Sequence, residues 1–206
     1  TPLYSSAASD VYKRQLFYWY EIVMHNLNVV ILALALIINN FEVDNYPCKI
    51  AGSIDDSDIN DEIVNPREQR KIDRFITLGL IAAAEAIKDS GFVSKNENSF
   101  RSGVMVGSGI GGLDTIYRNS SILDNQGIRK ISPFFIPSSL INLLSGHISI
   151  KYNLKGPNSS PVTACATGTH AIGDSFTIIK NNKADLMVCG GAEACLLYTS
   201  PSPRDS

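Results

Sequence analysis

Two short apolar segments that run directly into glycines place the tightest constraint on the fold. Residues 103–106 precede the glycine-rich run at 107–112 (GSGIGG), and residues 185–189 precede Gly190-Gly191. Apolar runs of this length that end in turn residues are typical of strands buried on both faces of a sheet. We therefore expect the chain to be built around a buried central sheet.

Helical patterns separate these strands. The longest starts at Asn65, which can cap a helix, with Pro66 at the first helical position and Glu68 placed to close a capping box. Apolar residues follow at helical spacing until Gly91, which predicts one helix of about six turns.

Three further helices and a third strand complete the pattern. We expect helices from the glycine run to Leu123, from Pro137 through Ile148 and from Cys165 to Lys180, and a strand over residues 161–164. The resulting order of β-α-α-β-α-β predicts a layered α/β fold.

The two ends of the chain differ from its middle. Residues 1–15 and 195–206 are not periodic and resemble translated adapter or cloning sequence, so we exclude them from the fold. Residues 16–40 are uncertain: a targeting or membrane segment, a buried element and a mistranslated stretch all stay open. Their longest apolar run, 29–38, is shorter than the roughly 20 residues that span a bilayer. The regular part is residues 41–194.

Charge and cysteine content exclude several classes of function. The formal net charge is −2, which provides no basic field for nucleic acid or an acidic membrane surface. The four cysteines have no zinc-type spacing, and the chain has only three histidines. We expect no nucleic-acid partner, no membrane partner and no metal, and a reducing compartment, either the cytoplasm or an organelle.

Cys165 is the candidate nucleophile. It lies where the predicted strand at 161–164 turns into a helix, so the unpaired N–H groups and the positive end of the helix dipole are close to it. This environment stabilises a thiolate and a developing oxyanion, and the small neighbours Ala164 and Ala166 leave room for a carbonyl. From spacing alone, a buried and inert cysteine is the alternative.

Several segments, in this order and with these gaps, resemble the elongating β-ketoacyl-ACP synthases, in particular synthase II. They are GSGIGG at 107–112, RKISPFFIP at 129–137, GPN at 156–158, TAC at 163–165 and GGAE at 190–193. The resemblance runs from Ile38 to Ala194. It implies the N-terminal half of a thiolase-like fold, with a central mixed sheet covered by helices.

The resemblance also implies a reaction. Cys165 would take an acyl chain from the phosphopantetheine arm of acyl carrier protein, and the carbanion formed from malonyl-ACP by loss of CO2 would attack it. The product would be a 3-oxoacyl-ACP two carbons longer. This chemistry needs no metal or nucleotide cofactor, and the family resemblance suggests a homodimer.

Candidate substrate-binding residues follow from the same resemblance. The loop that contains Gly109 and Ile110 borders the acyl pocket of the family, and Ile110 matches the residue that gates chain length there. Phe135 and Ala164 are the other candidates. Ordinary core packing is the alternative for Ile110 and Phe135.

The glycine run and the three histidines also fit other functions, for which the sequence gives weaker support. The glycine run also fits the dinucleotide fingerprint G-x-G-x-x-G, but no strand ending in an acidic residue follows about 20 residues later. His170 follows Cys165 by five residues, which places it on a different side of a helix. The two catalytic histidines of the family come from its second half, so we expect structural roles for His25, His147 and His170.

Departures from the family leave other functions open. We find no opening strand of the family's type before Phe41 and no counterpart of the second half, so this chain is expected to be an incomplete fragment. A polyketide synthase ketosynthase domain is the alternative enzyme, and a thiolase is disfavoured by the FFIP run at 134–137 and the TAC segment at 163–165. A non-catalytic chain-length-factor-like subunit would typically replace that cysteine.

Overall fold

The computed structural model describes residues 17–23, 27–28, 31–32, 35–37, 49–52, 54, 59 and 61–195. The suspected adapter segments 1–15 and 195–206 lie outside the described residues, Cys195 apart, and so does His25. Among the helices that are described, none combines the length and apolar character needed to cross a membrane.

A mixed sheet forms the centre of the molecule, in the order β2-β1-β8-β6-β7, with β3 paired to β1. The parallel strands are β6 (Ser102–Gly107), β7 (Asn158–Ser159) and β8 (Leu186–Gly191). β1 (Phe17–Val23) runs antiparallel to β8, so part of the uncertain segment 16–40 lies along the sheet. The short strands are β2 (Leu27–Asn28), β3 (Ile31–Leu32), and a separate pair of β4 (Ala35–Ile37) and β5 (Ile50–Gly52).

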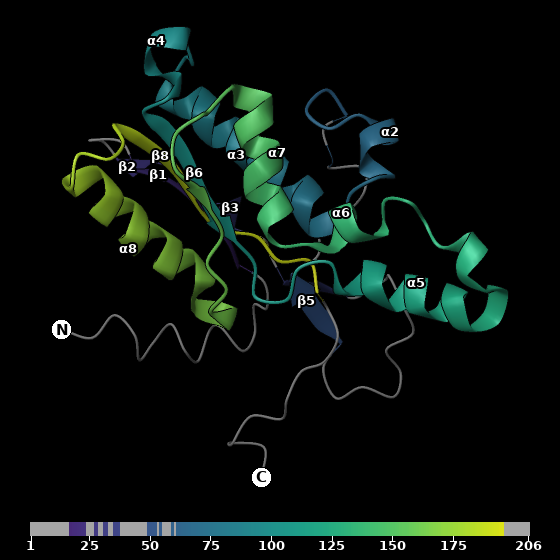
Figure 1. Ribbon diagram of the computed structural model, residues 1–206. Coiled ribbons are helices and arrows are strands. Elements are labelled where there is room, and N and C mark those ends of the chain that lie inside the picture. Colours follow the sequence, from purple (N-terminus) through teal and green to yellow (C-terminus); the bar gives the residue numbers. More distant parts are fainter. Residues whose placement is uncertain are drawn as a thin grey trace.

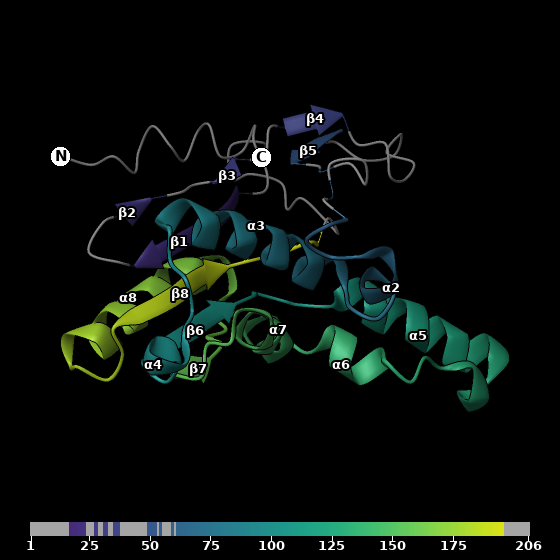
Figure 2. The ribbon, with the colours of Figure 1, turned by 90° about the horizontal axis from the view of Figure 1, so that it is seen from above.

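Helices cover both faces of the sheet (Figures 1 and 2). α8 (Thr167–Lys180) packs on one face, and α3 (Arg74–Ser90) and α7 (Asn142–Tyr152) pack on the other. The remaining helices lie around this core: α2 (Pro66–Gln69), α4 (Asn96–Ser99), α5 (Leu113–Gln126), α6 (Phe135–Ser139), and the 3-10 turns η2 (Ile128–Lys130) and η3 (Ala164–Ala166).

Side chains that alternate along β6 and β8 contribute to two separate core clusters. Val104 and Val106 belong to the cluster that contains α3 and α7, whereas Met105 packs with Met187 and Cys189 in the cluster beneath α8. Successive side chains of a strand point to opposite faces, so each central strand supplies both clusters. This explains why the segments 103–106 and 186–189 carry no charged or polar side chain, as a strand buried on both faces requires.

The predicted helix from Asn65 to Gly91 is two helices, and the single-helix prediction was wrong. Asn65 does cap the first: its side chain accepts from the backbone N–H of Arg67 and Glu68, each at 3.0 Å. The second begins after Asp73, whose backbone is extended and whose carboxylate accepts from the N–H of Phe75. An N-capping residue has non-helical dihedrals, so Asp73 interrupts the pattern. Gly91 ends the helix with φ 66°, as expected.

Two further predictions need correction. The helix predicted from Pro137 through Ile148 is broken between α6 and α7, because the carbonyl of Ser139 accepts from Gly112 N at 3.2 Å and is not used within a helix. The strand predicted over residues 161–164 is absent from the described structure. The parallel strand there is β7, which ends at Ser159, shortly before Pro161, a residue that cannot donate to a ladder.

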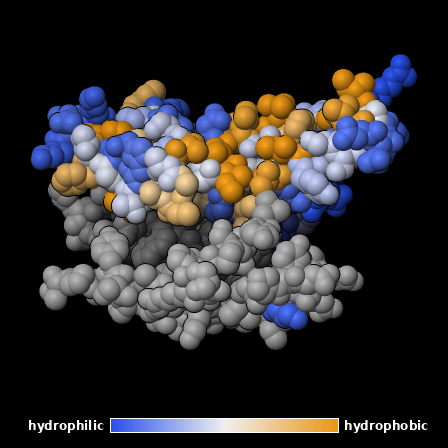
Figure 3. All heavy atoms as spheres, turned by 90° about the horizontal axis from the view of Figure 1, so that it is seen from below, coloured by the Kyte–Doolittle hydropathy of each residue, from blue (hydrophilic) through white to orange (hydrophobic). Residues whose placement is uncertain are grey.

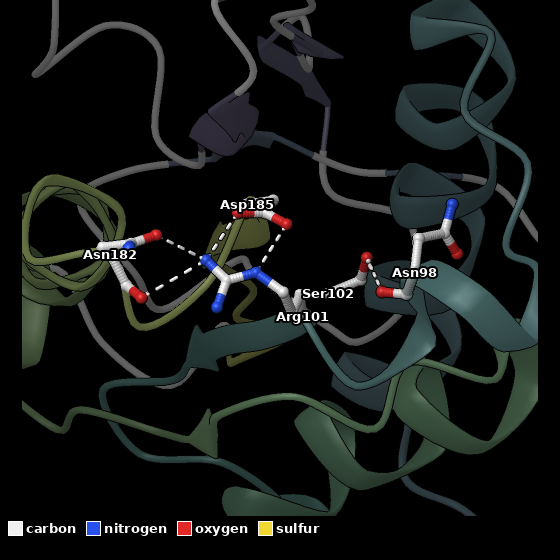
Figure 4. A network of polar contacts seen from close by, with 5 residues as sticks. All are labelled: Asn98, Arg101, Ser102, Asn182 and Asp185. Atoms are coloured by element: carbon white, nitrogen blue, oxygen red, sulfur yellow. Dashed lines mark hydrogen bonds and ion pairs between the residues drawn. The ribbon is translucent and has the colours of Figure 1, made fainter.

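A polar network closes one end of the sheet (Figure 4). The Arg101 guanidinium donates to both carboxylate oxygens of Asp185 at 2.6 Å, and also to the Asn182 side-chain oxygen at 2.7 Å. The backbone carbonyl of Arg101 accepts from Asp185 N at 2.8 Å. Because Arg101 precedes β6 and Asp185 precedes β8, this network helps to fix the register of the two strands.

Candidate active site

Cys165 lies in η3, two residues before the first residue of α8, and its side chain is exposed. The sequence prediction placed it correctly at the start of a helix, although a 3-10 turn and not a strand leads into it. The preceding residue, Ala164, has φ 50°, a left-handed conformation that is unfavourable for a residue with a Cβ. Non-glycine residues in this region persist only where surrounding contacts hold them, and they concentrate at functional sites.

The Thr167 hydroxyl holds this turn. It accepts from the backbone N–H of Thr163 at 2.9 Å and donates to the carbonyl of Ala164 at 2.8 Å. Thr167 is buried, so these hydrogen bonds are shielded from solvent. They fix the backbone on both sides of Cys165, and the left-handed Ala164 with it.

Three glycines bring the start of α8 against the ends of the central strands. A Cβ on Gly107 would lie 2.0 Å from the Pro161 carbonyl oxygen, and one on Gly191 would lie 3.1 Å from Gly168 N. Gly107 and Gly191 are themselves paired at the end of the β6–β8 ladder. Any side chain at these positions would push the turn that carries Cys165 away from the sheet.

The glycine-rich loop after β6 lies beside Cys165. A Cβ on Gly109 would come within 3.2 Å of the Ala164 backbone, so the loop contacts the residue that precedes Cys165. Ile110 follows Gly109, and 51% of its surface is exposed. Whether these residues bind substrate stays a prediction.

Phe135 is connected to the glycine loop less directly than Gly109 and Ile110 are. It is partly buried and begins α6, whose opposite end meets the glycine loop through the hydrogen bond from Gly112 N to Ser139 O. Its position relative to the loop is therefore set by α6 as a whole, and its role in binding also stays a prediction.

Glu193 was identified from the sequence only as part of the GGAE motif at 190–193, with no role of its own. Its carboxylate oxygen Oε2 accepts from the Ser108 hydroxyl at 3.1 Å and from Ile110 N at 2.9 Å. The acidic residue directly after the apolar strand and Gly190-Gly191 was the available signal, because a strand end that is parallel to β6 must emerge beside the loop that follows β6.

The described histidines have ordinary structural surroundings. His170 Nδ1 lies 3.2 Å from the Thr163 hydroxyl, and its Nε2 lies 3.1 Å from Asp174. His147 lies on α7, across the sheet from α8, and burial lowers its pKa although Glu68 acts in the opposite direction. Within the described residues, no group of histidine, cysteine and acidic side chains could hold a metal ion.

Apolar side chains gather in a band across the described surface seen in Figure 3. The exposed apolar residues of the glycine loop, α5 and the α6 region are Ile110, Ile116, Tyr117, Leu123, Phe134, Ile136 and Leu140. Exposed apolar groups of this number are more than scattered single residues and are typical of a surface that contacts another molecule or segment.

Comparison with known proteins gives a consistent family match. Residues 38–200 match the family model for the N-terminal domain of beta-ketoacyl synthase. The chain is 46% identical over 164 residues to 3-oxoacyl-[acyl-carrier-protein] synthase 2 of Rhizobium meliloti, an alignment that covers 76% of this chain and 39% of the relative. It is 44% identical over 156 residues to the protein of the same name from Vibrio harveyi, covering 76% and 37%. The chain thus spans about two fifths of the length of these relatives.

Solved structures show the same fold. A beta-ketoacyl synthase from Burkholderia phymatum superposes with a TM-score of 0.62 at 23% identity, covering 75% of this chain and 38% of that one. A ketosynthase solved with its type II polyketide acyl-carrier protein, bound to the hexaketide, gives a TM-score of 0.58 at 29% identity, covering 65% and 38%. The fold of this chain is therefore thiolase-like.

Proposed function

Since this chain belongs to the beta-ketoacyl synthase family, we propose that it comes from a 3-oxoacyl-[acyl-carrier-protein] synthase that elongates an acyl chain held on Cys165. The observation that carries the proposal is the position of Cys165, which is exposed at the start of α8 and lies next to Gly109 across Ala164. A cysteine at a helix N-terminus has the backbone donors and dipole that favour thiolate attack.

The first step is acyl transfer. The thiolate of Cys165 attacks the thioester carbonyl of acyl-ACP, the carbonyl oxygen becomes an oxyanion, and the phosphopantetheine sulfur leaves as the tetrahedral intermediate collapses. The acyl group is then a thioester of Cys165. The hydrogen bonds of Thr167 hold the turn in one conformation, which fixes the sulfur for this attack.

The second step forms the carbon–carbon bond. Malonyl-ACP loses CO2, the resulting carbanion attacks the acyl carbonyl on Cys165, and the Cys165 thiolate leaves. The product is a 3-oxoacyl-ACP two carbons longer. The step needs no metal or nucleotide because loss of CO2 supplies the electron pair. The residues that assist decarboxylation in the family belong to its second half, which this chain does not match.

Acyl carrier protein is the partner this chemistry requires. A solved relative is a ketosynthase in complex with its carrier protein, which supports the assignment. The exposed basic residues here are Arg67, Arg70 and Lys71 near α2, with Arg129 and Lys130 in η2. The Lys71 ammonium lies 5.3 Å from the ring centroid of Phe134, which connects these two basic segments. These cations can pair with acidic groups of a carrier protein, although exposed Asp61, Glu62 and Glu68 lie in the same segment as the first three.

A second copy of the protein is the other proposed partner. β7 is the last strand in the order of the described sheet, and both of its residues are exposed. An open edge strand presents unpaired backbone groups to which the same strand of a second copy can pair about a two-fold axis. We place this dimer in a reducing compartment, the cytoplasm in the simplest case.

A polyketide ketosynthase is the second candidate, supported by the carrier-protein complex among the solved relatives. The higher identity to synthases named for 3-oxoacyl-ACP, 46% and 44%, favours fatty acid elongation. The presence of Cys165 argues against a non-catalytic chain-length-factor-like subunit.

Mass spectrometry of the chain after treatment with cerulenin, which alkylates condensing-enzyme cysteines, tests the proposal. We expect an adduct on Cys165 that forms faster than on buried Cys189 or partly buried Cys195 and disappears in Cys165→Ala. Cys195→Ala is the matched control and should leave the Cys165 adduct unchanged. Equal labelling of all thiols, or none on Cys165, would contradict an activated nucleophile.

A further inference from the structure

We infer that Glu193 is a positioning residue that holds Ile110 at a fixed place beside Cys165 and thereby sets how the site accepts a long acyl chain. The inference rests on the proposed function. Glu193 lies two residues beyond Gly191, whose partner Gly107 ends the β6–β8 pairing and begins the glycine loop. It therefore stands at the point where the loop leaves the sheet.

The Glu193 carboxylate and the Ser108 hydroxyl together hold most of this loop. Glu193 Oε2 accepts from Ser108 Oγ and from Ile110 N at 3.1 and 2.9 Å, and Ser108 Oγ in turn accepts from Gly111 N at 3.0 Å. The base of the loop is tied separately, by the hydrogen bond from Ala192 N to Gly107 O at 3.0 Å. Glu193 is thus the anchor for the part that carries Ile110.

Gly109 links this anchor to the nucleophile. It lies between the two positions bonded to Glu193, and a Cβ there would come within 3.2 Å of Ala164. Ala164 is joined to Cys165 and is held by Thr167. The chain of contacts from Glu193 through Ile110 and Gly109 to Ala164 is therefore continuous, so the position of Ile110 relative to the Cys165 sulfur depends on Glu193.

The second carboxylate oxygen supports a role beyond stability. Glu193 Oε1 is buried and has no hydrogen-bond partner among the described residues. A buried, unsatisfied oxygen on a charged group costs free energy, so a carboxylate here is not the choice that stability alone would favour. Positioning of the loop provides the compensating role.

Two alkylating probes of different length test the inference on the chain itself. Iodoacetamide and N-decyl iodoacetamide carry the same reactive group, and only the second carries an alkyl chain that the inference places against Ile110. We expect the wild-type chain to react faster with the decyl probe at Cys165. Glu193→Ala and Glu193→Asp, which remove or shorten the anchor, should lower the decyl-to-iodoacetamide rate ratio by roughly three- to ten-fold.

Glu193→Gln is the rescue variant, because its amide oxygen can still accept from Ser108 and Ile110. It should keep a ratio within about two-fold of wild type. In an Ile110→Ala background, Glu193→Ala should change the ratio by less than about two-fold, since its effect is carried by Ile110. Glu85→Ala, an exposed acidic position on α3, is the matched control and should change nothing.

The outcomes separate this inference from the proposed function. Absence of any Cys165 adduct in wild type would contradict both. A reactive Cys165 with the same rate ratio in wild type, Glu193→Ala and Glu193→Asp would overturn the positioning role alone, as would equal loss in Glu193→Gln and Glu193→Ala. Thermal unfolding identifies any variant that fails to fold; if that is Glu193→Ala, the comparison of Glu193→Asp with Glu193→Gln decides.

Discussion

The hydroxyl of Thr115 donates to Oδ2 of Asp73 over 2.6 Å, which ties the first turn of α5 to the start of α3. The same oxygen accepts from Thr115 N at 3.2 Å, while Oδ1 accepts from Phe75 N at 3.2 Å. One carboxylate therefore caps two helices at their positive ends. α5 directly follows the glycine loop, so this contact also fixes the far end of the loop beside Cys165.

Asp73→Ala should lower the free energy of unfolding by about 2–3 kcal/mol, because it removes an N-cap and leaves buried donors without an acceptor. Asp73→Asn keeps one carbonyl oxygen, so its free energy of unfolding should lie between those of wild type and Asp73→Ala. Chemical denaturation measures both. Glu85→Ala on the exposed side of α3 is the control, expected within about 0.5 kcal/mol of wild type. An Asp73→Ala chain as stable as this control would exclude the double cap.

Ser145→Ala should destabilise the chain by about 1–3 kcal/mol, the cost of a buried donor left unsatisfied. The buried Ser145 hydroxyl accepts from Val106 N at 2.9 Å, at the level where β7 has already ended beside β6. The Ser145 hydroxyl therefore takes the place of a β7 backbone acceptor for Val106 N. Ser160 Oγ lies 3.0 Å from the same hydroxyl. Ser120→Ala, on the exposed face of α5, is the control for the chemical change in a denaturant titration and should have almost no effect.

Asp185→Asn should remove an acid-dependent part of the stability. The side-chain hydrogen bonds from Arg101, and then its charge, lower the pKa of Asp185 below the ordinary value of 3.8. A carboxylate with a lowered folded-state pKa contributes stability that is complete above 3.8 and is lost as pH falls through the lower folded value. Urea midpoints measured from pH 7 down to pH 2.5 should therefore converge for wild type and Asp185→Asn at the acid end. Curves that stay parallel would contradict this linkage. The size of the effect is small because the pair is exposed.

Gly107→Ala and Gly146→Ala should have opposite effects. A Cβ at Gly107 would meet Pro161 O at 2.0 Å, whereas one at Gly146 in α7 would meet nothing within 4 Å. The first change should destabilise the chain and slow alkylation of Cys165, because the turn must move. The second should stabilise it by about 0.5–1 kcal/mol, the ordinary gain of alanine over glycine inside a helix. Thermal midpoints and thiol alkylation rates of both variants test the pair, and equal midpoints would refute the close approach.

Ala164→Gly should relieve a strained backbone. Glycine adopts φ 50° freely, so the native state should gain about 1 kcal/mol, part of which is offset by the greater freedom of glycine in the unfolded chain. Ala164→Val should destabilise the chain, because a β-branched residue is disfavoured at this φ. Denaturation midpoints in the order glycine, alanine, valine would agree with the left-handed turn; an unchanged valine variant would not.

Local patterns predicted the elements well and their interruptions poorly. The apolar runs of β6 and β8 and the caps at Asn65 and Gly91 depend on neighbouring residues, and the structure confirms them. The break at Asp73 and the break after Ser139 depend on partners far along the chain, Thr115 and Gly112, which no local pattern contains. The predicted strand at 161–164 failed partly for this reason, since Ser160 bonds to Val106 across the fold. Pro161, which cannot extend the ladder, was a local signal against the strand.

The position of Cys165 could be predicted from the sequence, but the contacts of Glu193 with the neighbouring loop could not. Cys165 at a helix start follows from the sequence around it, whereas the family resemblance identifies Gly109 only as a residue of a loop that borders the acyl pocket. The contact of Glu193 with Ser108 and Ile110 joins residues more than 80 positions apart. Only the parallel pairing of β6 with β8 brings them together, and strand order is not written in any single segment.

The glycine loop also limits how this protein can diversify. Gly107 and Gly112 have no space for a Cβ, Gly111 has φ 75° and Ser108 is buried and bonded. Ile110 is exposed and can change size without displacing its neighbours. A library randomised across residues 107–112 and selected for folding should therefore return almost its whole variety at Ile110.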